Sequence, residues 1–276
     1  MKNLTQRVLM ALWGIPLILI LSYLGGYFFF GLVLLINGMS LWEFYSIFKK
    51  QNLQAYRMAG LILSTMLILV AYWFPGEIFF NALIFTLMVV LLIHLRITRP
   101  NSSLNTTLTI AGIFYISVFL SALLMVRMNL NSWMGWPSSS NLTGKFFLLI
   151  WISIWICDTA AYFGGKAMGK HKLAPLTSPH KTIEGAVFGV LGAIATFYAL
   201  TPLLIPQLPT LHLWLSALTV GIFGQLGDLV ESRFKRDAGV KDTSTILPGH
   251  GGFLDRFDSL IFVSPFFYLL FYYIKP

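Results

Sequence analysis

The chain has 276 residues, of which 57% are hydrophobic and only 11% are charged, and its formal net charge is +9. A soluble domain carries about 25% charged residues, so this composition excludes an ordinary soluble domain and favours lipid as the solvent of the chain. Cationic loops and anionic phosphate ligands account for the positive charge of a membrane protein, and we therefore expect no nucleic-acid partner.

Nine apolar runs are candidates for membrane helices, each of which needs about 20 mainly apolar residues. The first run follows a short basic start and lacks the cleavage site of a signal peptide, so we expect a retained membrane helix. Gly25 and Gly26 divide the longest apolar stretch into a tight helical hairpin. The predicted spans, in chain order, are 8–25, 27–48, 57–75, 78–95, 106–127, 146–165, 183–205, 211–231 and 257–274.

The basic residues indicate the orientation of these spans. If the N-terminus lies in the cytoplasm, 16 of the 19 Lys and Arg residues fall in cytoplasmic segments, and only Arg127, Lys145 and Lys275 fall on the other side. This asymmetry follows the positive-inside rule. We therefore predict an all-α, polytopic integral membrane protein of about nine transmembrane helices in the lipid bilayer, with a cytoplasmic N-terminus and an external C-terminus.

The acidic residues divide the chain into two halves. Eight of the ten Asp and Glu residues lie at or after Asp158, and only Glu43 and Glu77 precede it. We therefore predict a single membrane domain, 1–276, with mainly scaffold helices in 1–145 and a catalytic half in 146–276, whose cytoplasmic loops are 166–182 and 232–256.

The first chemical motif lies at the inner end of the sixth span. Asp158, Tyr162 and Gly165 recur at spacings of four and three residues, so they share one helix face. Ionisable residues are costly in a membrane helix and usually face a cavity, although a structural Asp bonded to neighbouring helices is the alternative. The stretch from Gly164 to Lys170 has the spacing of a phosphate loop, but it lacks the preceding strand and the following Ser or Thr, so we predict none.

The second motif, Ser178 to Gly185, opens the seventh span. A hydroxyl residue followed by Glu184 near a helix start is typical of a helix cap. A helix N-terminus also binds phosphate through its free N–H groups, and Lys181 would add a positive charge there. Both interpretations, a cap and a ligand site, stay open from this stretch alone.

The third motif places Asp228 among closely spaced glycines near the inner end of the eighth span. Small residues let helices approach closely, and packing is the simpler explanation for Gly221 and Gly224. Packing does not explain a carboxylate in an otherwise apolar span.

The fourth motif, 232–258, combines three features. Its Pro-Gly-His-Gly-Gly turn, 248–252, has glycines that allow backbone N–H groups to approach an anion. Asp255 and Asp258 lie three residues apart at the start of the last helix, a spacing suited to holding Mg²⁺. The positive-inside rule explains the cations of the loop but neither the paired aspartates nor the glycine turn. The cations, which could bind phosphate groups, are Lys235, Arg236, Lys241 and Arg256.

Residues 232–258 resemble the signature of the CDP-diacylglycerol synthase family, also called the phosphatidate cytidylyltransferases, over their whole length. The stretches from Asp158 to Gly165 and from Ser178 to Gly185 are similar to two upstream patterns of that family. The resemblance implies transfer of the cytidylyl group of CTP to phosphatidate, which gives CDP-diacylglycerol and pyrophosphate for phospholipid biosynthesis. It also implies Mg²⁺ as the cofactor, with a second cation left open, and a homodimer.

This activity requires a site at the inner boundary of the membrane, because CTP is cytosolic and phosphatidate stays in the leaflet. We expect a multi-pass protein of a bacterial inner membrane whose active site faces the cytoplasm. The predicted metal ligands are Asp228, Asp255 and Asp258, and the predicted catalytic residues are these three with Lys241 and Arg256. The predicted substrate-binding residues are Asp158, Tyr162, Ser178, Lys181, Thr182, Glu184, Lys235, Arg236, Asp242, His250, Gly251 and Gly252.

Two other functions stay open from the sequence. A CTP-dependent synthase or kinase acting on another membrane lipid or isoprenoid phosphate would use similar chemistry. No residue pattern in the sequence indicates which acyl chains are recognised. An ion-coupled transporter could use Asp158 and Asp228 as intramembrane carboxylates. A path through the membrane needs polar residues along its full depth, whereas the polar residues of this chain cluster on the inner side.

Overall fold

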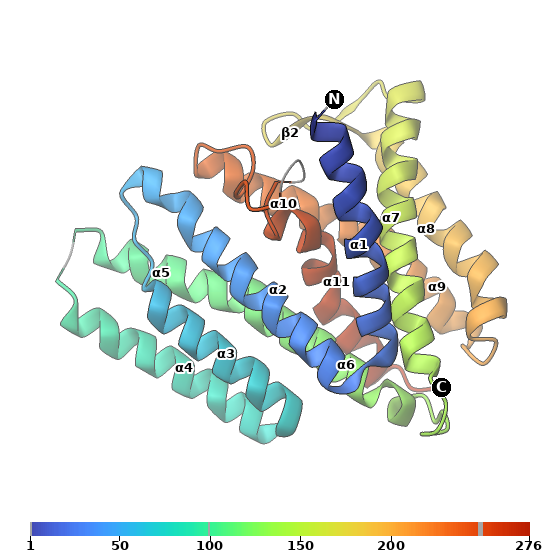
Figure 1. The fold of residues 1–276 in the computed structure, drawn as a ribbon, viewed down its shortest axis with the longest axis horizontal. Helices are drawn as coiled ribbons and strands as arrows, with labels where there is room; N and C mark the ends of the chain where they lie inside the picture. The colour runs from blue at the N-terminus through green and yellow to red at the C-terminus, as the bar shows by residue number, and fades with distance from the viewer. Residues whose placement is uncertain (1, 99, 248–250) are drawn as a thin grey trace.

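The computed structural model describes residues 2–98, 100–247 and 251–276 (Figure 1). The first half of the chain folds into helices because a helix satisfies the main-chain polar groups of an apolar segment internally. Its elements are α1 (Lys2–Leu24), α2 (Gly26–Ile47), the 3₁₀ turn η1 (Phe48–Gln51), α3 (Arg57–Trp73), α4 (Glu77–Arg96), α5 (Ser102–Gly112), the π-helical segment η2 (Ile113–Val118) and α6 (Phe119–Trp133).

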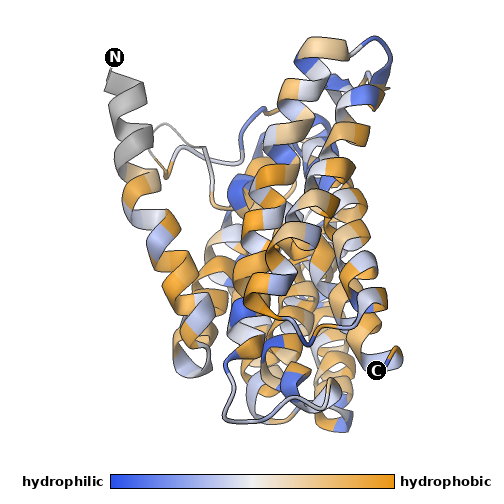
Figure 2. Ribbon diagram, turned by 90° about the vertical axis from the view of Figure 1, so that its right-hand side faces the viewer, coloured by the Kyte–Doolittle hydropathy of each residue, from blue (hydrophilic) through white to orange (hydrophobic). Residues whose placement is uncertain are grey.

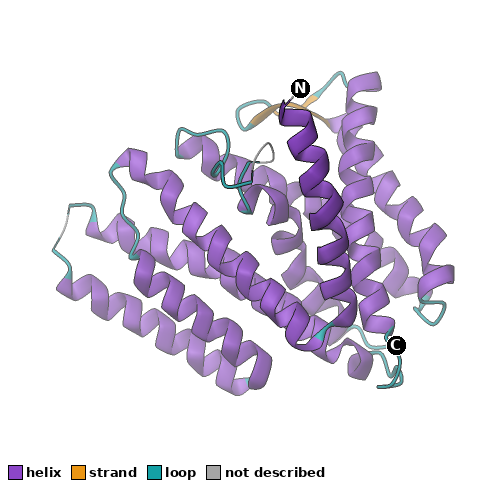
Figure 3. Cartoon of the chain, in the orientation of Figure 1, coloured by secondary structure: helices purple, strands orange, loops and turns teal. Residues whose placement is uncertain are grey.

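The second half adds a small β-hairpin to the helices (Figure 3). Strands β1 (Lys172–Ala174) and β2 (Ser178–Thr182) pair antiparallel, with Lys172 opposite Thr182. The segment predicted as a loop at 166–182 therefore contains regular structure. The helical elements of this half are α7 (Leu142–Met168), α8 (Ile183–Leu204), α9 (Thr210–Leu218), the π-helical segment η3 (Thr219–Gly224), α10 (Gln225–Asp237) and α11 (Leu254–Tyr273).

Each predicted span overlaps one helix or one continuous series of helical segments. Two series, Ser102–Trp133 and Thr210–Asp237, pass through a π-helical segment without a break. Within the described residues, six helices are long and apolar enough to cross a membrane, and Met10–Leu24 and Arg57–Trp73 are shorter apolar helices. The all-α, polytopic membrane class is confirmed, whereas the number of crossings and the sides of the termini stay predictions.

The predicted hairpin between the first two helices is present. Gly25 and Gly26 have φ values of +70° and +52°, in the left-handed region that favours glycine. Arg127 packs against Gly25 so closely that a Cβ there would collide with its guanidinium group. The same guanidinium donates to the carbonyl oxygens of Ser22 at 3.1 Å and Tyr23 at 3.0 Å, at the C-terminal end of α1. These bonds satisfy carbonyl groups that the end of a helix leaves free.

One large hydrophobic cluster includes residues from both halves of the chain. The aromatic ring of Phe234 on α10 lies 5.1 Å from that of Phe44 on α2 and 5.5 Å from that of Tyr115 on η2, measured between centroids. Aromatic pairs at these separations stabilise beyond the area that they bury. The first half of the chain thus holds α10, which carries several of the predicted site residues.

Three of the segments that the sequence predicts to be cytoplasmic lie toward the same end of the molecule. The N-terminus, the β-hairpin and the segment after α10 lie toward the top of Figure 1, whereas the turn between α1 and α2 and the C-terminus lie toward the bottom. Figure 2 shows hydrophobic residues along much of the helical length and hydrophilic residues in the loops. These three segments and the turn between α1 and α2 thus lie at opposite ends, as the predicted orientation of the first span requires, whereas the sides of the membrane stay predictions.

Candidate active site

A cavity of about 680 Å³ is lined by residues of α7, β1, β2, α8, α10, the segment after α10, and α11. All four sequence motifs contribute to its lining, although they are far apart in the chain. The predicted site residues that line it are Asp158, Tyr162, Lys181, Thr182, Asp228, Lys235, Asp242, Asp255, Arg256 and Asp258.

Glycine brings α7 and α8 together at one wall of the cavity. A Cβ on Gly185 would lie 2.7 Å from the carbonyl oxygen of Ala161 and 3.0 Å from Gly165 Cα, so a larger residue would force the helices apart. Thr182 ends β2 and caps α8, and its hydroxyl oxygen accepts a hydrogen bond from the Gly185 N–H at 3.1 Å. The cap fixes Lys181, the preceding residue, at the entrance to the helix beside the cavity.

Helix α10 presents its polar residues to the same space. Gln225 Nε2 donates to the carbonyl oxygen of Ala186 at 3.0 Å, which ties the start of α10 to α8. Asp228, Glu231 and Lys235 follow at spacings of three and four residues, so they share one helix face. All three line the cavity.

Three carboxylates converge inside the cavity. Oxygen atoms of Asp228, Glu231 and Asp258 all lie within 4.8 Å of one another. The side chains of Glu231 and Asp258 are buried. Like charges at this separation repel one another in a buried site, and a cation between them relieves the repulsion. Carboxylate oxygens are also the ligands that Mg²⁺ prefers, so the group suits a hard divalent cation.

Lysine side chains neutralise part of this acidic charge. Lys181 Nζ lies 2.6 Å from Asp228 Oδ2, and Lys235 Nζ lies 2.5 Å from Glu231 Oε2 and 2.7 Å from Asp255 Oδ1. Among the described residues that line the cavity there are six carboxylates and four Lys or Arg side chains. Acidic charge therefore remains in excess, which favours binding of a divalent cation.

Asp255 is held differently from the three converging carboxylates. Its Oδ2 accepts hydrogen bonds from the main-chain N–H groups of Gly252 at 2.7 Å and Thr243 at 3.1 Å. Burial raises the pKa of Asp255, which precedes the predicted span 257–274, but hydrogen bonding with Glu231, Lys235 and Gly252 outweighs burial and holds the pKa below its usual range. The carboxylate of Asp255 is thus surrounded by hydrogen-bond donors of the protein. The three converging carboxylates are Asp228, Glu231 and Asp258, so Glu231 takes the place that the sequence predicted for Asp255.

The remaining predicted site residues do not line this cavity in the described structure. Glu184 accepts hydrogen bonds from the main-chain N–H groups of Lys170 at 3.0 Å and His171 at 3.2 Å, and so holds the turn before β1. Arg236 donates to the carbonyl oxygen of Thr177 at 3.2 Å, which ties α10 to the β-hairpin. Ser178 begins β2, Lys241 is exposed after α10, Gly251 and Gly252 precede α11, and His250 lies outside the described residues.

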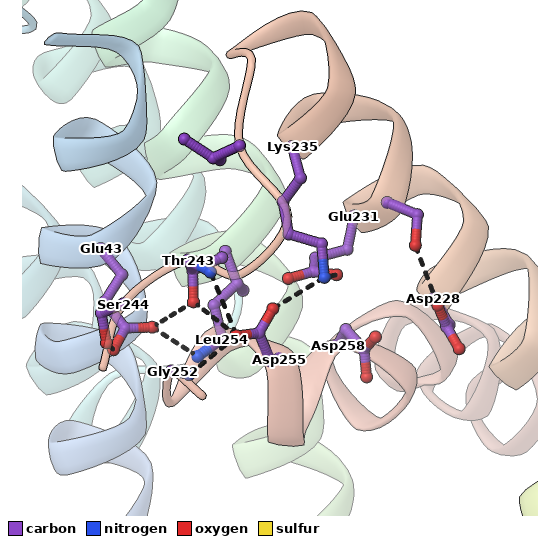
Figure 4. A network of polar contacts seen from close by, with 12 residues as sticks. Glu43, Asp228, Glu231, Lys235, Thr243, Ser244, Gly252, Leu254, Asp255 and Asp258 are labelled. Atoms are coloured by element: carbon purple, nitrogen blue, oxygen red, sulfur yellow. Dashed lines mark hydrogen bonds and ion pairs between the residues drawn. The ribbon is translucent and has the colours of Figure 1, made fainter. Parts of the chain in front are cut away.

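Sequence reasoning did not assign Glu231 to the site, although the three-residue spacing from Asp228 could have identified it. Lys166, His180 and Gln225 also line the cavity, although they were not among the predicted site residues. Glu43 on α2 reaches the segment before α11 from the part of the chain predicted to be scaffold (Figure 4). No local pattern in the sequence indicates that contact.

Comparison with known proteins identifies relatives over the whole chain. Residues 5–274 match the family model of the cytidylyltransferase family. The chain is 35% identical over 277 aligned residues to a protein of Bacillus subtilis named phosphatidate cytidylyltransferase, and the alignment covers 98% of each chain. It is 50% identical over 131 residues to a Staphylococcus epidermidis protein of the same name, an alignment that spans 46% of this chain and 48% of the relative, or about half of that relative's length.

Proposed function

The chain belongs to the cytidylyltransferase family, and we propose that it is the phosphatidate cytidylyltransferase of its membrane. It transfers the cytidylyl group of CTP to phosphatidate and produces CDP-diacylglycerol and pyrophosphate for phospholipid biosynthesis. The observation that carries this proposal is the meeting of four separate motifs in one cavity at one end of an apolar helical protein. A water-soluble nucleotide and a membrane lipid can both reach such a position.

The charges of the cavity fit phosphate substrates that bind together with a metal. Lys181, Lys235 and Arg256 line the cavity and can bind phosphate oxygens of CTP or of the lipid. Its volume of about 680 Å³ lies in the range of small-molecule sites, roughly 300 to 1,000 Å³.

Mg²⁺ fits the three converging carboxylates. Asp228, Glu231 and Asp258 would hold it, because their oxygen atoms lie within 4.8 Å of one another and line the cavity. Asp255 is a weaker candidate ligand than the sequence predicted, since Lys235, Gly252 and Thr243 already donate to its two oxygens. Bound Mg²⁺ supplies Lewis-acid stabilisation of the charge on the triphosphate. A second cation remains an open part of the proposal.

The chain's own residues position the reactants. A phosphate oxygen of phosphatidate forms a bond to the α-phosphorus of CTP, and the bond from that phosphorus to the bridging oxygen of the β-phosphate breaks, so that pyrophosphate leaves with the electron pair. The lipid supplies the nucleophile, and no protein nucleophile is required. Lys181, Lys235 and Arg256 reduce the repulsion between the two anionic substrates and bind the leaving pyrophosphate, because phosphoryl transfer depends mainly on positioning and electrostatic stabilisation.

The location and assembly of the protein are further parts of the proposal. The named bacterial relatives support an inner-membrane location, and the asymmetry of basic residues supports a site that faces the cytoplasm. We also propose a homodimer, which rests on the resemblance to the family.

A transfer assay tests the proposed reaction. Purified protein in detergent is supplied with Mg²⁺, phosphatidate and CTP labelled at the α-phosphate, and label is measured in the lipid phase. We expect labelled lipid with release of one pyrophosphate per transfer. In the matched assay, CTP labelled at the γ-phosphate should leave the lipid unlabelled.

The outcomes separate the alternatives. Transfer of γ-label to lipid would make the protein a kinase, and transfer of α-label only to another lipid phosphate would replace phosphatidate as the acceptor. Folded protein that labels no lipid acceptor would contradict the enzyme proposal as a whole.

A further inference from the structure

Glu43 is a buried carboxylate on α2, far in the sequence from every motif of the candidate site. Its side chain is 1% exposed. A buried charge is strongly unfavourable unless hydrogen bonds or opposite charges compensate it. Glu77, the other acidic residue before Asp158, is exposed at the start of α4 and provides a natural comparison.

The compensation for Glu43 comes from the segment that leads into α11 (Figure 4). Oε1 accepts hydrogen bonds from Ser244 Oγ at 2.6 Å and from the Phe253 N–H at 2.9 Å. Oε2 accepts hydrogen bonds from Thr243 Oγ1 at 2.8 Å and from the Leu254 N–H at 2.8 Å. Phe253 and Leu254 form the N-terminus of α11, where free N–H groups and the helix dipole favour a negative charge.

We call the hydrogen bonds from Thr243, Ser244, Phe253 and Leu254 to Glu43 the Glu43 clamp. Thr243 connects this clamp to the cavity. Its hydroxyl lies 2.8 Å from Glu43 Oε2 and 3.1 Å from Asp255 Oδ2, so one hydroxyl group contacts two carboxylates. Asp255 in turn binds Lys235 Nζ at 2.7 Å, and Lys235 pairs with Glu231 at 2.5 Å. A continuous series of contacts thus links α2 to one of the three converging carboxylates.

Gly252, which precedes α11, allows this arrangement because it has no side chain. A Cβ on Gly252 would collide with Thr243 Oγ1 and with the carboxylate of Glu43. The Gly252 N–H points at Asp255 instead, with a hydrogen bond of 2.7 Å. The anion that this glycine approaches in the structure is therefore a carboxylate of the protein.

We propose that Glu43 is a positioning residue of the transferase: it holds Thr243 and Ser244 against the start of α11 at Phe253 and Leu254 and, through Thr243, Asp255 and Lys235, sets the position of Glu231 in the cavity. This inference rests on the proposed function for its catalytic consequence. The clamp itself does not depend on which substrate is bound, and it can be measured without turnover.

The test compares Glu43→Gln with Glu77→Gln. Both changes remove a carboxylate from the first half of the chain, but only Glu43→Gln replaces, in a carboxylate that faces four donors, one acceptor oxygen by an NH2 group, which cannot accept. We expect Glu43→Gln to accelerate hydrogen exchange in the segment that contains Phe253 and Leu254, to lower kcat by on the order of 10- to 100-fold and to raise the Mg²⁺ concentration for half-maximal activity. Glu77→Gln should match wild type in all three measurements.

Other results would overturn the inference. Folded Glu43→Gln protein with unchanged exchange, or with faster exchange but wild-type kcat and Mg²⁺ dependence, shows that Glu43 does not position the site. If wild type labels no lipid at all, the proposed function fails, and hydrogen exchange still decides whether Glu43 clamps the segment.

A second pair of variants covers a failure of Glu43→Gln to fold. Thr243→Ser keeps the hydroxyl that contacts Glu43 and Asp255, whereas Thr243→Val removes it at similar size. We expect Thr243→Val to show the exchange and kinetic changes and Thr243→Ser to retain most of the wild-type behaviour. A Thr243→Val variant that equals wild type would overturn the proposed connection.

Discussion

Two groups of carboxylates lie around the first turn of α11, and they differ in what surrounds them (Figure 4). Glu43 and Asp255 accept hydrogen bonds from hydroxyl groups, from Lys235 and from main-chain N–H groups of the segment before the helix. Asp228, Glu231 and Asp258 lie within 4.8 Å of one another, with Lys181 paired to Asp228 and Lys235 to Glu231. Fewer hydrogen bonds reach them: Ser232 Oγ donates to Asp228, and the Ser259 N–H donates to Asp258. Carboxylates therefore have two roles here. Glu43 and Asp255 hold the chain in place because many hydrogen-bond donors surround them, whereas Asp228, Glu231 and Asp258 have fewer donors and stay available for a cation.

We call Asp228, Glu231 and Asp258 the cation-binding carboxylates. Removal of one of them is expected to have the largest effect. Asp258→Asn should reduce cytidylyl transfer by ~10³-fold, because it removes charge that holds Mg²⁺ close to the reacting phosphates. The transfer assay with α-labelled CTP measures the loss. Asp237→Asn is the matched control, since Asp237 is exposed and pairs with Arg233 on the surface of α10. Equal loss in both variants would show that the assay does not report on the cavity.

Glu231→Gln should have the next largest effect. We expect the Mg²⁺ concentration for half-maximal activity to rise by on the order of 10-fold or more, since an amide is a poorer ligand than a carboxylate for a hard cation. A titration of activity against Mg²⁺ at saturating CTP measures the shift. An unchanged titration curve would show that Glu231 is not one of the cation-binding carboxylates.

Gly252→Ala tests the surroundings of Glu43 and Asp255, because Gly252 packs against Thr243 and Glu43. The added methyl would collide with Thr243 and Glu43, and overpacking of this kind destabilises a protein by ~1–3 kcal/mol. Thermal unfolding in detergent at a fixed scan rate should show a lower midpoint. Gly38→Ala on α2 is the control, because a Cβ at Gly38 meets no atom within 4 Å. A variant at Gly252 as stable as its control would contradict the close packing of Gly252 against Thr243 and Glu43.

An exposed ion pair on the same helix should have the smallest effect. Arg233 and Asp237 pair at 3.0 Å, but their side chains are 58% and 48% exposed. Exposed pairs contribute ~0–1 kcal/mol, so Arg233→Ala should leave transfer activity and the unfolding midpoint close to wild type. A large loss of activity in that variant would show that charge outside the cavity controls the reaction.

Much of this architecture could be predicted from the sequence because its signals are local. Apolar runs of the length of a membrane span locate the helices, and Gly25 with Gly26 locates the first hairpin. The motifs around Asp158, Lys181 and Asp228 locate residues that line the cavity. Each of these features depends on spacing within one helix or turn.

The parts that could not be predicted depend on contacts between distant segments. Glu43 lies about 200 residues from the hydroxyl groups that it accepts hydrogen bonds from, and nothing near it in the sequence indicates them. The choice between Asp255 and Glu231 depends on which carboxylate already accepts hydrogen bonds from Gly252 and its neighbours. That choice is made by the contacts of Thr243, Gly252 and Lys235 with Asp255, which spacing along α11 does not determine.

Cation binding without turnover tests the distinction between the two groups most directly. Mn²⁺ serves as a paramagnetic probe for the Mg²⁺ site, and its binding to wild type, Glu231→Gln and Asp255→Asn proteins is measured by electron paramagnetic resonance. We predict that Glu231→Gln weakens Mn²⁺ binding by on the order of 10-fold and that Asp255→Asn weakens it less. Loss of binding in Asp255→Asn with wild-type binding in Glu231→Gln would contradict the account and return Asp255 to the set of metal ligands.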